Sequence, residues 1–209
     1  MSRRSDIGDK ACARCRYRGC LCHRLLEDRI LDRYCIHLCV HCLKNKTYLL
    51  KEITDIRTGY SFRSKLEPDT KGNILVVQLK ELSDKNRVDI STAVKIYMHN
   101  ISDNYFLRKN DLVFRSRGID STAAIMDISS DNIILSAPFQ RIRLRDTSKI
   151  IPEYLLWYIN CKEAQAYFAA NKTGSSLVMI STAVLANLPV VIPSLEIQKK
   201  IIEINYLSG

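Results

Sequence analysis

Two pairs of cysteines near the start of the chain have the spacing of ligands to a zinc ion. Cys12 and Cys15 form one pair, Cys39 and Cys42 form the other, and 23 residues separate the two pairs. Two thiolates spaced in this way hold one side of a tetrahedral Zn2+, so the four sulfurs together predict a structural zinc site. A flexible segment without a ligand, a translated stretch upstream of the functional start, and disulfides stay open as alternatives. Further potential ligands in this segment are Cys20, Cys22, Cys35, His23, His37 and His41.

Three turns rich in basic and hydroxyl side chains have the chemistry of a DNA-binding surface. Glycine allows backbone amides to approach a phosphate, arginine and lysine neutralise it, and arginine, serine or threonine can recognise base edges in the major groove. Taken singly, each turn is also consistent with an ordinary solvated turn. The candidate DNA-binding residues are Arg57, Thr58, Gly59, Ser61, Arg63 and Lys65 in the first turn, Arg115, Arg117 and Gly118 in the second, and Lys172, Gly174 and Ser175 in the third.

The chain lacks the residue patterns of enzymes that act on DNA. A DNA methyltransferase needs a glycine-rich cofactor loop and an Asn- or Asp-Pro-Pro-aromatic motif, and neither occurs in the sequence. Asp55 with Asp69 and Lys71 is the nearest approach to a metal-dependent nuclease site, but Asp69 lies in a predicted turn. Cys161 lies in an apolar helical pattern, where a buried small side chain is favoured over a nucleophile. We therefore expect a non-catalytic protein.

The composition bounds the class of protein. The chain has 209 residues, 46% of them hydrophobic, which is enough to bury one core of ordinary size with a further segment beside it. Lysine and arginine number 32 against 22 aspartate and glutamate, and this excess favours a polyanionic partner such as nucleic acid. No apolar run has the length of a membrane span, and the first residues lack the apolar stretch of a secretory signal. An intracellular, reducing setting is therefore expected.

Hydrophobic periodicity and turn residues predict the elements that position the three basic turns. The fold class that they favour is α+β, with a mixed sheet and flanking helices. Residues 84–104 are expected to be rich in loops. The predicted helices cover 48–56, 152–170, 182–187 and 195 to the end, and the predicted strands cover 73–79, 111–117, two runs between 132 and 145 around Pro138, and 188–192.

Five aromatic side chains gather in the predicted helix 152–170. They could form a platform on which bases stack, but aromatic residues at helical spacing pack more often in a core. We therefore expect a core role for Tyr154, Trp157, Tyr158, Tyr167 and Phe168.

Several strings of the chain, taken in order, resemble the DNA specificity subunit of type I restriction-modification enzymes. The strings are Leu50–Gly59, Asn110–Gly118, Pro152–Leu155, Gly174–Ser176, Leu185–Pro193 and Leu195–Ile201. They correspond to one target recognition domain followed by the start of a spacer helix. Members of this family usually carry two such domains separated by long helices, whereas this chain has one. The cysteine-rich segment has no counterpart in the family pattern.

The resemblance implies a non-catalytic subunit that recognises a DNA sequence. The implied partners are double-stranded DNA, a methyltransferase (modification) subunit, a restriction subunit bound through the complex, and a second half-subunit or a second copy of the chain. It implies no cofactor for the recognition domain, no membrane, and the cytoplasm of a bacterium or archaeon. The rival hypothesis is a zinc-dependent interaction or regulatory protein that functions through the cysteine-rich segment.

The same resemblance suggests three parts of the chain. Residues 1–46 form the basic, cysteine-rich segment, residues 47–193 form the recognition domain, and residues 194–209 start the spacer helix. Ile197, Ile201 and Ile204 recur at helical spacing in the last part. We expect these three side chains to line an exposed stripe that binds a partner.

Overall fold

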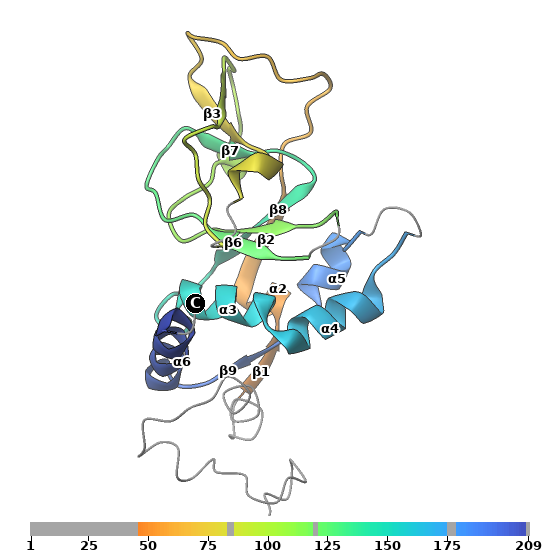
Figure 1. Ribbon diagram of the computed structural model, residues 1–209, viewed down its shortest axis with the longest axis vertical. Coiled ribbons are helices and arrows are strands. Elements are labelled where there is room, and N and C mark those ends of the chain that lie inside the picture. Colours follow the sequence, from red (N-terminus) through yellow and green to blue (C-terminus); the bar gives the residue numbers. More distant parts are fainter. Residues whose placement is uncertain (1–45, 83–85, 119–120, 175–178, 208–209) are drawn as a thin grey trace, which may run out of the picture.

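The computed structural model describes residues 46–82, 86–118, 121–174 and 179–207 (Figure 1). The four cysteines of the predicted zinc site and Ser175 of the third basic turn lie outside these residues. The strands are β1 (Lys46–Leu49), β2 (Thr54–Thr58), β3 (Ile74–Val77), β4 (Val94–Ile96), β5 (Leu112–Arg115), β6 (Ala123–Ile125), β7 (Ile133–Leu135), β8 (Phe139–Leu144) and β9 (Pro189–Ile192). The helices are α2 (Leu50–Ile53), α3 (Pro152–Asn160), α4 (Lys162–Asn171), α5 (Thr182–Ala186) and α6 (Leu195–Leu207), with short 3-10 turns at Leu79–Glu81 and Asp103–Tyr105.

The strands of the described residues form three sheets. A four-stranded antiparallel sheet has the order β2-β8-β5-β6 and lies at the centre of the molecule. A three-stranded sheet, β4-β3-β7, forms an upper lobe, in which β3 and β7 run parallel. Strands β1 and β9 form a two-stranded antiparallel ribbon, which pairs the start of the described chain with the segment just before α6. The α+β class with mixed strand pairing is thus confirmed.

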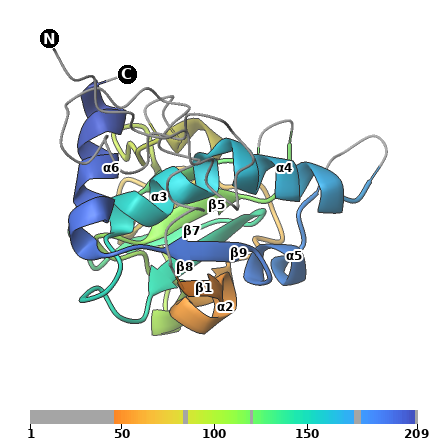
Figure 2. The same ribbon diagram turned by 90° about the horizontal axis from the view of Figure 1, so that it is seen from below.

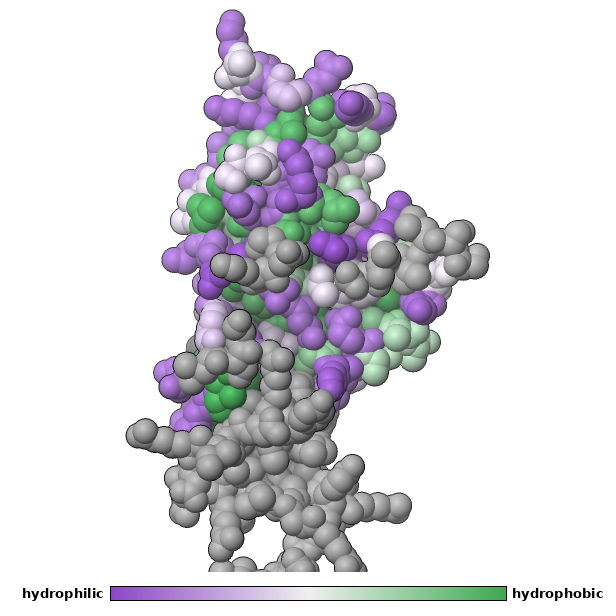
Figure 3. Space-filling view, viewed as in Figure 1, coloured by the Kyte–Doolittle hydropathy of each residue, from purple (hydrophilic) through white to green (hydrophobic). Residues whose placement is uncertain are grey.

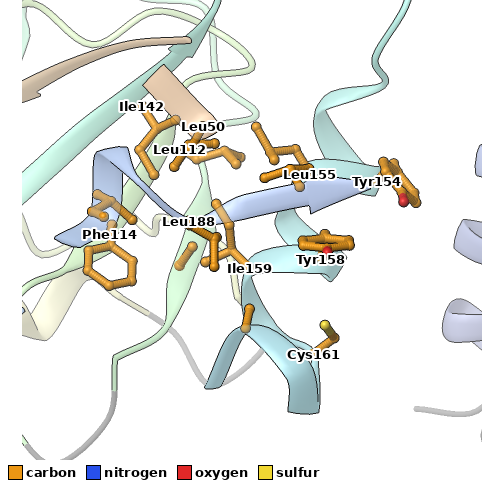
Figure 4. Packing of buried hydrophobic residues seen from close by; sticks show 14 of the residues in the cluster. Leu50, Leu112, Phe114, Ile142, Tyr154, Leu155, Tyr158, Ile159, Cys161 and Leu188 are labelled. Atoms are coloured by element: carbon orange, nitrogen blue, oxygen red, sulfur yellow. The ribbon is translucent and has the colours of Figure 1, made fainter. Parts of the chain in front are cut away.

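One face of the central sheet is covered by helices. Helices α3 and α4 lie end to end along this face, with α6 beside α3 and α5 near the end of α4 (Figure 2). The core between them joins Leu112, Phe114 and Ile142 of the sheet to Tyr154 and Tyr158 of α3 (Figure 4). The hydroxyl of Tyr154 donates to the carbonyl of Val191 at 2.7 Å, so its one polar atom is satisfied in the core.

The opposite face of the central sheet packs on the upper lobe. Val113, Ala124 and Phe139 of the central sheet join Val77 and Leu135 of the lobe in a second apolar cluster. A third, smaller cluster lies on the far side of the lobe, around Ile74, Val76 and Ile134. Because Val113 and its neighbours Leu112 and Phe114 are all buried, β5 has apolar side chains on both faces, as strands between two packed layers do.

The expectation of a single helix over 48–56 is wrong. Only Leu50–Ile53 is helical, and Thr54–Thr58 forms a strand against β8. The hydroxyl of Thr54 donates to the carbonyl of Leu50 at 2.7 Å and so closes the helix after one turn. Long-range pairing with β8 then outweighs the local helical pattern, because it satisfies the backbone of a whole strand.

The expected helix over 152–170 is broken in the middle. Cys161 has an extended backbone, with φ −74° and ψ 163°, and separates α3 from α4. Asn160 stands at the break, where its side-chain amide accepts from the backbone N–H of Ala123 at 2.8 Å and donates to the carbonyl of Ala123 at 2.9 Å. These two bonds tie the end of α3 to β6, and the chain turns before it continues as α4.

The five aromatic residues of α3 and α4 belong to the core, as expected. Tyr154, Tyr158 and Phe168 are buried, and Trp157 and Tyr167 pack against the same cluster. Cys161 is also buried, and burial raises the pKa of its thiol to about 12. The expectation that Cys161 is a buried small side chain and not a nucleophile agrees with both observations.

Besides β2, three short strands are not predicted by the sequence patterns, namely β1 at Lys46–Leu49, β4 within the expected loop 84–104 and β6 at Ala123–Ile125. The strands near 73–79, 111–117 and 132–145 form as expected, and so do α5, β9 and the start of α6. None of the helices within the described residues has the length and apolar character needed to cross a membrane.

The expected exposed isoleucine stripe on α6 is wrong. Ile201 is only 4% exposed, and Ile197 and Ile204 pack against the same core as α3. Gln198, fully buried, fixes the helix in place, since it accepts from the N–H of Ile151 and donates to the carbonyls of Lys149 and Pro193, each at 2.9 Å. These three isoleucines of α6 therefore pack within this chain.

Candidate nucleic-acid interface

The three basic turns meet at one end of the central sheet. Strand β8 starts at Phe139, between the last residue of β2 and the last residue of β5, because Thr58 pairs with Gln140 and Arg115 pairs with Phe139. The first and second turns therefore leave the sheet side by side. The third turn joins them through Met179, which pairs with both Thr173 and Arg117. We call this end of the sheet the three-turn surface.

The first turn is held tightly against the start of β8. The N–H of Gly59 donates to the carbonyl of Phe139 at 2.9 Å, and the N–H of Tyr60 donates to the carbonyl of Leu135 at 2.6 Å. A Cβ on Gly59 would lie 2.5 Å from the carbonyl oxygen of Ser136. The N–H of Gly59 is thus bonded within the chain, and the absence of a side chain at Gly59 allows this close backbone packing.

The second turn presents arginines on either side of a buried serine. Ser116 is buried, and its hydroxyl donates to the carbonyl of Pro138. Arg115 is half-buried, and its Nε is buried without a hydrogen-bond partner, whereas Arg117 is exposed. Gly118 has φ +122°, a conformation that only glycine adopts readily, so it allows the chain to turn directly after Arg117.

The third turn is tied to the second by backbone bonds. Thr173 and Met179 exchange two N–H to carbonyl bonds of 3.0 and 2.9 Å, and the N–H of Ile180 donates to the carbonyl of Ser116 at 2.9 Å. The side-chain amide of Gln140, which is 3% exposed, donates to the carbonyl of Ile180 at 3.4 Å. Lys172 and Gly174 are exposed next to these anchors.

Arg57 lies one residue before the end of β2 and shares a carboxylate with a buried arginine. Its Nε donates to Asp55 Oδ1 at 3.2 Å, while Nη2 of Arg141 donates to Asp55 Oδ2 at 2.5 Å. Burial lowers the pKa of the Arg141 guanidinium, and the nearby charge of Arg143 lowers it further. Arg143 itself forms two 2.7 Å bonds to Asp111, which raise its pKa.

The remaining candidates of the first turn lie farther along the chain. Ser61, Arg63 and Lys65 are exposed on the segment that leads from β2 up to β3. Figure 3 shows hydrophilic side chains gathered on the flank between the upper lobe and α5. The exposed basic side chains of the three-turn surface and of this segment are of the kind that contact a phosphate backbone.

Three residues of the three-turn surface are not predicted by the sequence to belong to the site. Gln140, Met179 and Ile180 hold the second and third turns together, but none is basic or lies in a glycine turn. The one signal available in the sequence is a neutral polar residue, Gln140, at the start of a strand in which apolar and polar side chains alternate. Among the residues that the structure describes, no group of three or more His, Cys, Asp or Glu side chains is placed to hold a metal ion.

An α+β domain that gathers three basic turns at one end of its central sheet belongs, by fold and surface chemistry, to the class of candidate nucleic-acid-binding domains. The family model described as the type I restriction modification DNA specificity domain matches residues 43–204, and the chain belongs to this family. A comparison with curated proteins finds no match.

Solved structures with the same fold come from the same kind of system. The HsdS subunit from Thermoanaerobacter tengcongensis is 17% identical, with a TM-score of 0.55 over 77% of this chain and 36% of that subunit. The type I restriction-modification S subunit from M. genitalium is 13% identical, with a TM-score of 0.53 over 79% of this chain and 39% of that subunit. The chain thus spans less than half the length of these subunits.

Proposed function

We propose that this chain is a DNA-sequence-recognition module of a type I restriction-modification system. Membership of the specificity-domain family supports the proposal. The observation that carries it furthest is the convergence of three basic turns at the start of β8, through the pairing of Thr58 with Gln140, of Arg115 with Phe139 and of Arg117 with Met179. Turns fixed on a rigid sheet end can hold side chains at constant distances from base edges.

The three-turn surface offers both kinds of contact that a DNA reader needs. Lys172 and Arg117 are exposed and have no carboxylate partner among the described residues, so they are suited to phosphate oxygens. Arg115 is the last residue of β5 and Arg57 lies one residue before the end of β2, so both are suited to base edges in the major groove of duplex DNA. The module binds DNA and leaves the chemistry to other subunits.

Its partners in this proposal are a methyltransferase (modification) subunit and, through the complex, a restriction subunit. The chain spans less than half of the HsdS and S subunits that share its fold. A second half-subunit, or a second copy of this chain, supplies the other half of the DNA site. The complex acts in the cytoplasm of a bacterium or archaeon, where the DNA is.

Copurification from the native host tests the proposal. We expect the chain to copurify with a methyltransferase subunit that carries an Asn-Pro-Pro-aromatic motif. The copurified complex is then presented with a pool of randomised duplexes, and bound duplexes are sequenced. An enriched motif supports the proposal. A chain that copurifies without a methyltransferase, in a complex that enriches no motif, would contradict it.

A further inference from the structure

A buried arginine stands directly beside Arg57 of the three-turn surface. Arg141 on β8 is opposite Arg57 on β2, and its side chain is only 3% exposed. Its Nε and Nη1 atoms are buried without hydrogen-bond partners. A buried guanidinium with two unpaired donors is costly, so the one acceptor that it does reach has to be held firmly.

That acceptor is Asp55. Its Oδ2 lies 2.5 Å from Nη2 of Arg141, and among the described residues this is the one hydrogen bond that the Arg141 side chain makes. Arg143 is opposite Asp55 in the strand pairing, but it is engaged by Asp111 through two 2.7 Å bonds. Arg143 therefore leaves Asp55 to Arg141 and Arg57.

Asp55 in turn fixes Arg57. Oδ1 of Asp55 accepts from Nε of Arg57 at 3.2 Å, and the Arg57 side chain is 54% exposed. Both Nη groups of Arg57 are free of hydrogen bonds to the other residues that the structure describes. This leaves a guanidinium whose Nε is held by Asp55 while its outer edge is open to solvent. That edge carries the two parallel N–H donors that match O6 and N7 of guanine.

We propose that Asp55 is a specificity-determining positioning residue, which Arg141 anchors from the core and which holds Arg57 in one orientation for base recognition in duplex DNA. The inference rests on the proposed function and extends it to a residue that does not itself touch DNA. A carboxylate beside DNA repels phosphates, so its presence at this edge needs a gain elsewhere. The gain is discrimination between DNA sequences, because an arginine that is free to reorient would contact phosphates of any sequence.

This role makes a prediction opposite to that of simple electrostatics. Asp55→Asn removes one negative charge from the surface. If that charge acted only as a charge, its loss would tighten binding to every duplex by the same factor and make the salt dependence steeper. If Asp55 positions Arg57, its loss lowers the preference for the selected site over a scrambled duplex by about tenfold, while scrambled DNA binds as well as before or more tightly.

The test uses the copurified complex, with a duplex of the selected motif and a scrambled duplex of the same length as probes. Affinities are measured for the unchanged complex, Asp55→Asn, Arg57→Ala and the double variant. We expect both single variants to reduce discrimination, and Arg57→Ala to change it less than about twofold in the Asp55→Asn background, since the two residues act as a unit. Equal tightening on both duplexes, or fully additive losses, would overturn the proposal.

Two further variants keep the test decisive. Asp127→Asn is the matched control. The carboxylate of Asp127 is as exposed as that of Asp55, and the substitution likewise removes an ion pair with an arginine, here the 2.5 Å pair with Arg87. It is expected to leave discrimination unchanged. Asp55→Glu replaces Asp55→Asn if the latter does not fold: it retains the charge but moves the carboxylate, so we expect lost discrimination at an unchanged salt dependence. Full discrimination in Asp55→Glu would overturn the proposal, whereas a complex that shows no motif even before substitution refutes the proposed function itself.

Discussion

The backbone N–H of Ile180 donates a 2.9 Å hydrogen bond to the carbonyl of Ser116, and this bond joins the third basic turn to the second. Ser116 is in turn bonded through its hydroxyl to Pro138, just before β8. The three turns are thus connected to one strand, and the basic side chains that they carry share a fixed frame. A fixed frame is what allows a set of side chains to distinguish one DNA sequence from another.

The burial of α6 against the core can be tested at Ile201. Because this side chain is 4% exposed, Ile201→Ala leaves a cavity, and we expect the free energy of unfolding to fall by about 2 to 5 kcal/mol. Lys199→Ala, on an exposed position of the same helix, is the control and should have little effect. Urea unfolding followed by circular dichroism measures both. An Ile201→Ala variant as stable as the control would mean that α6 does not pack here.

The close approach at Gly59 predicts an unusually costly glycine substitution. In Gly59→Ala the new Cβ would meet backbone atoms of Ser136 at 2.5 to 2.6 Å, and backbone cannot move aside as a flexible side chain can. We expect a loss of about 1 to 3 kcal/mol in unfolding free energy. Thr70→Ala, exposed in the same segment, should be nearly neutral. If the midpoints of urea unfolding coincide for the two variants, the first turn is not packed on Ser136.

Cys161 predicts a loss of stability at alkaline pH. In the folded chain, burial raises the pKa of its thiol to about 12, whereas a thiol in the unfolded chain titrates near about 8.5. Below about pH 8.5 the thiol is protonated in both the folded and the unfolded chain, so its titration does not change the stability. As the pH rises above this value, the unfolded state loses its proton first, so the free energy of unfolding falls by up to about 1.4 kcal/mol per pH unit.

Cys161→Ala separates this effect from other titrations. Tyr158, whose pKa is raised to about 12 by burial, contributes a similar loss that starts near about pH 10. Unfolding free energies of the unchanged chain and of Cys161→Ala are measured under reducing conditions between about pH 7.5 and about pH 10.5. We expect the two curves to converge as the pH rises. Parallel curves would show that Cys161 is not buried as a thiol.

The predicted zinc site can be tested by removing residues 1–45. All three apolar clusters of the described residues are built from Leu50 onward. A chain beginning at Lys46 is therefore expected to fold with or without a chelator and to retain DNA recognition. If this shorter chain fails to fold while the full chain resists protease only with zinc present, Cys12, Cys15, Cys39 and Cys42 form a structural site and the zinc-dependent rival function gains support.

Local patterns were sufficient for the elements that carry their own signals. Strand β8, helix α5 and helix α6 have clear periodicity and turn residues, and their predicted bounds lie within a few residues of the observed ones. Strand β6 was not found, because Ala123 and Ala124 have little preference for strands. It forms because it pairs with β5 and because Asn160 binds the backbone of Ala123. The break at Cys161 depends on the same long-range contact.

The site was predictable in its parts but not in its arrangement. Arginine, lysine and glycine mark the three turns in the sequence, yet their meeting depends on the register that places Phe139 beside Arg115 and Gln140 beside Thr58. No local pattern encodes that register. Likewise, no local pattern relates Asp55, in a predicted helix, to Arg141, in a predicted strand, whereas the pairing of β2 with β8 brings their side chains within 2.5 Å.

DNA binding by variants of the three-turn surface tests the central claim most directly. In the copurified complex, Arg115→Ala, Arg117→Ala and Lys172→Ala are measured on the selected and scrambled duplexes over a range of salt concentrations. A residue that recognises a base should cost about 1 to 3 kcal/mol on the selected duplex alone, and one that binds phosphate should weaken both duplexes equally and lower the salt slope by about one. Ser148→Ala, on the exposed turn after β8, is the control and should change neither. If all three basic variants bind both duplexes as tightly as the control, the three-turn surface is not the DNA interface.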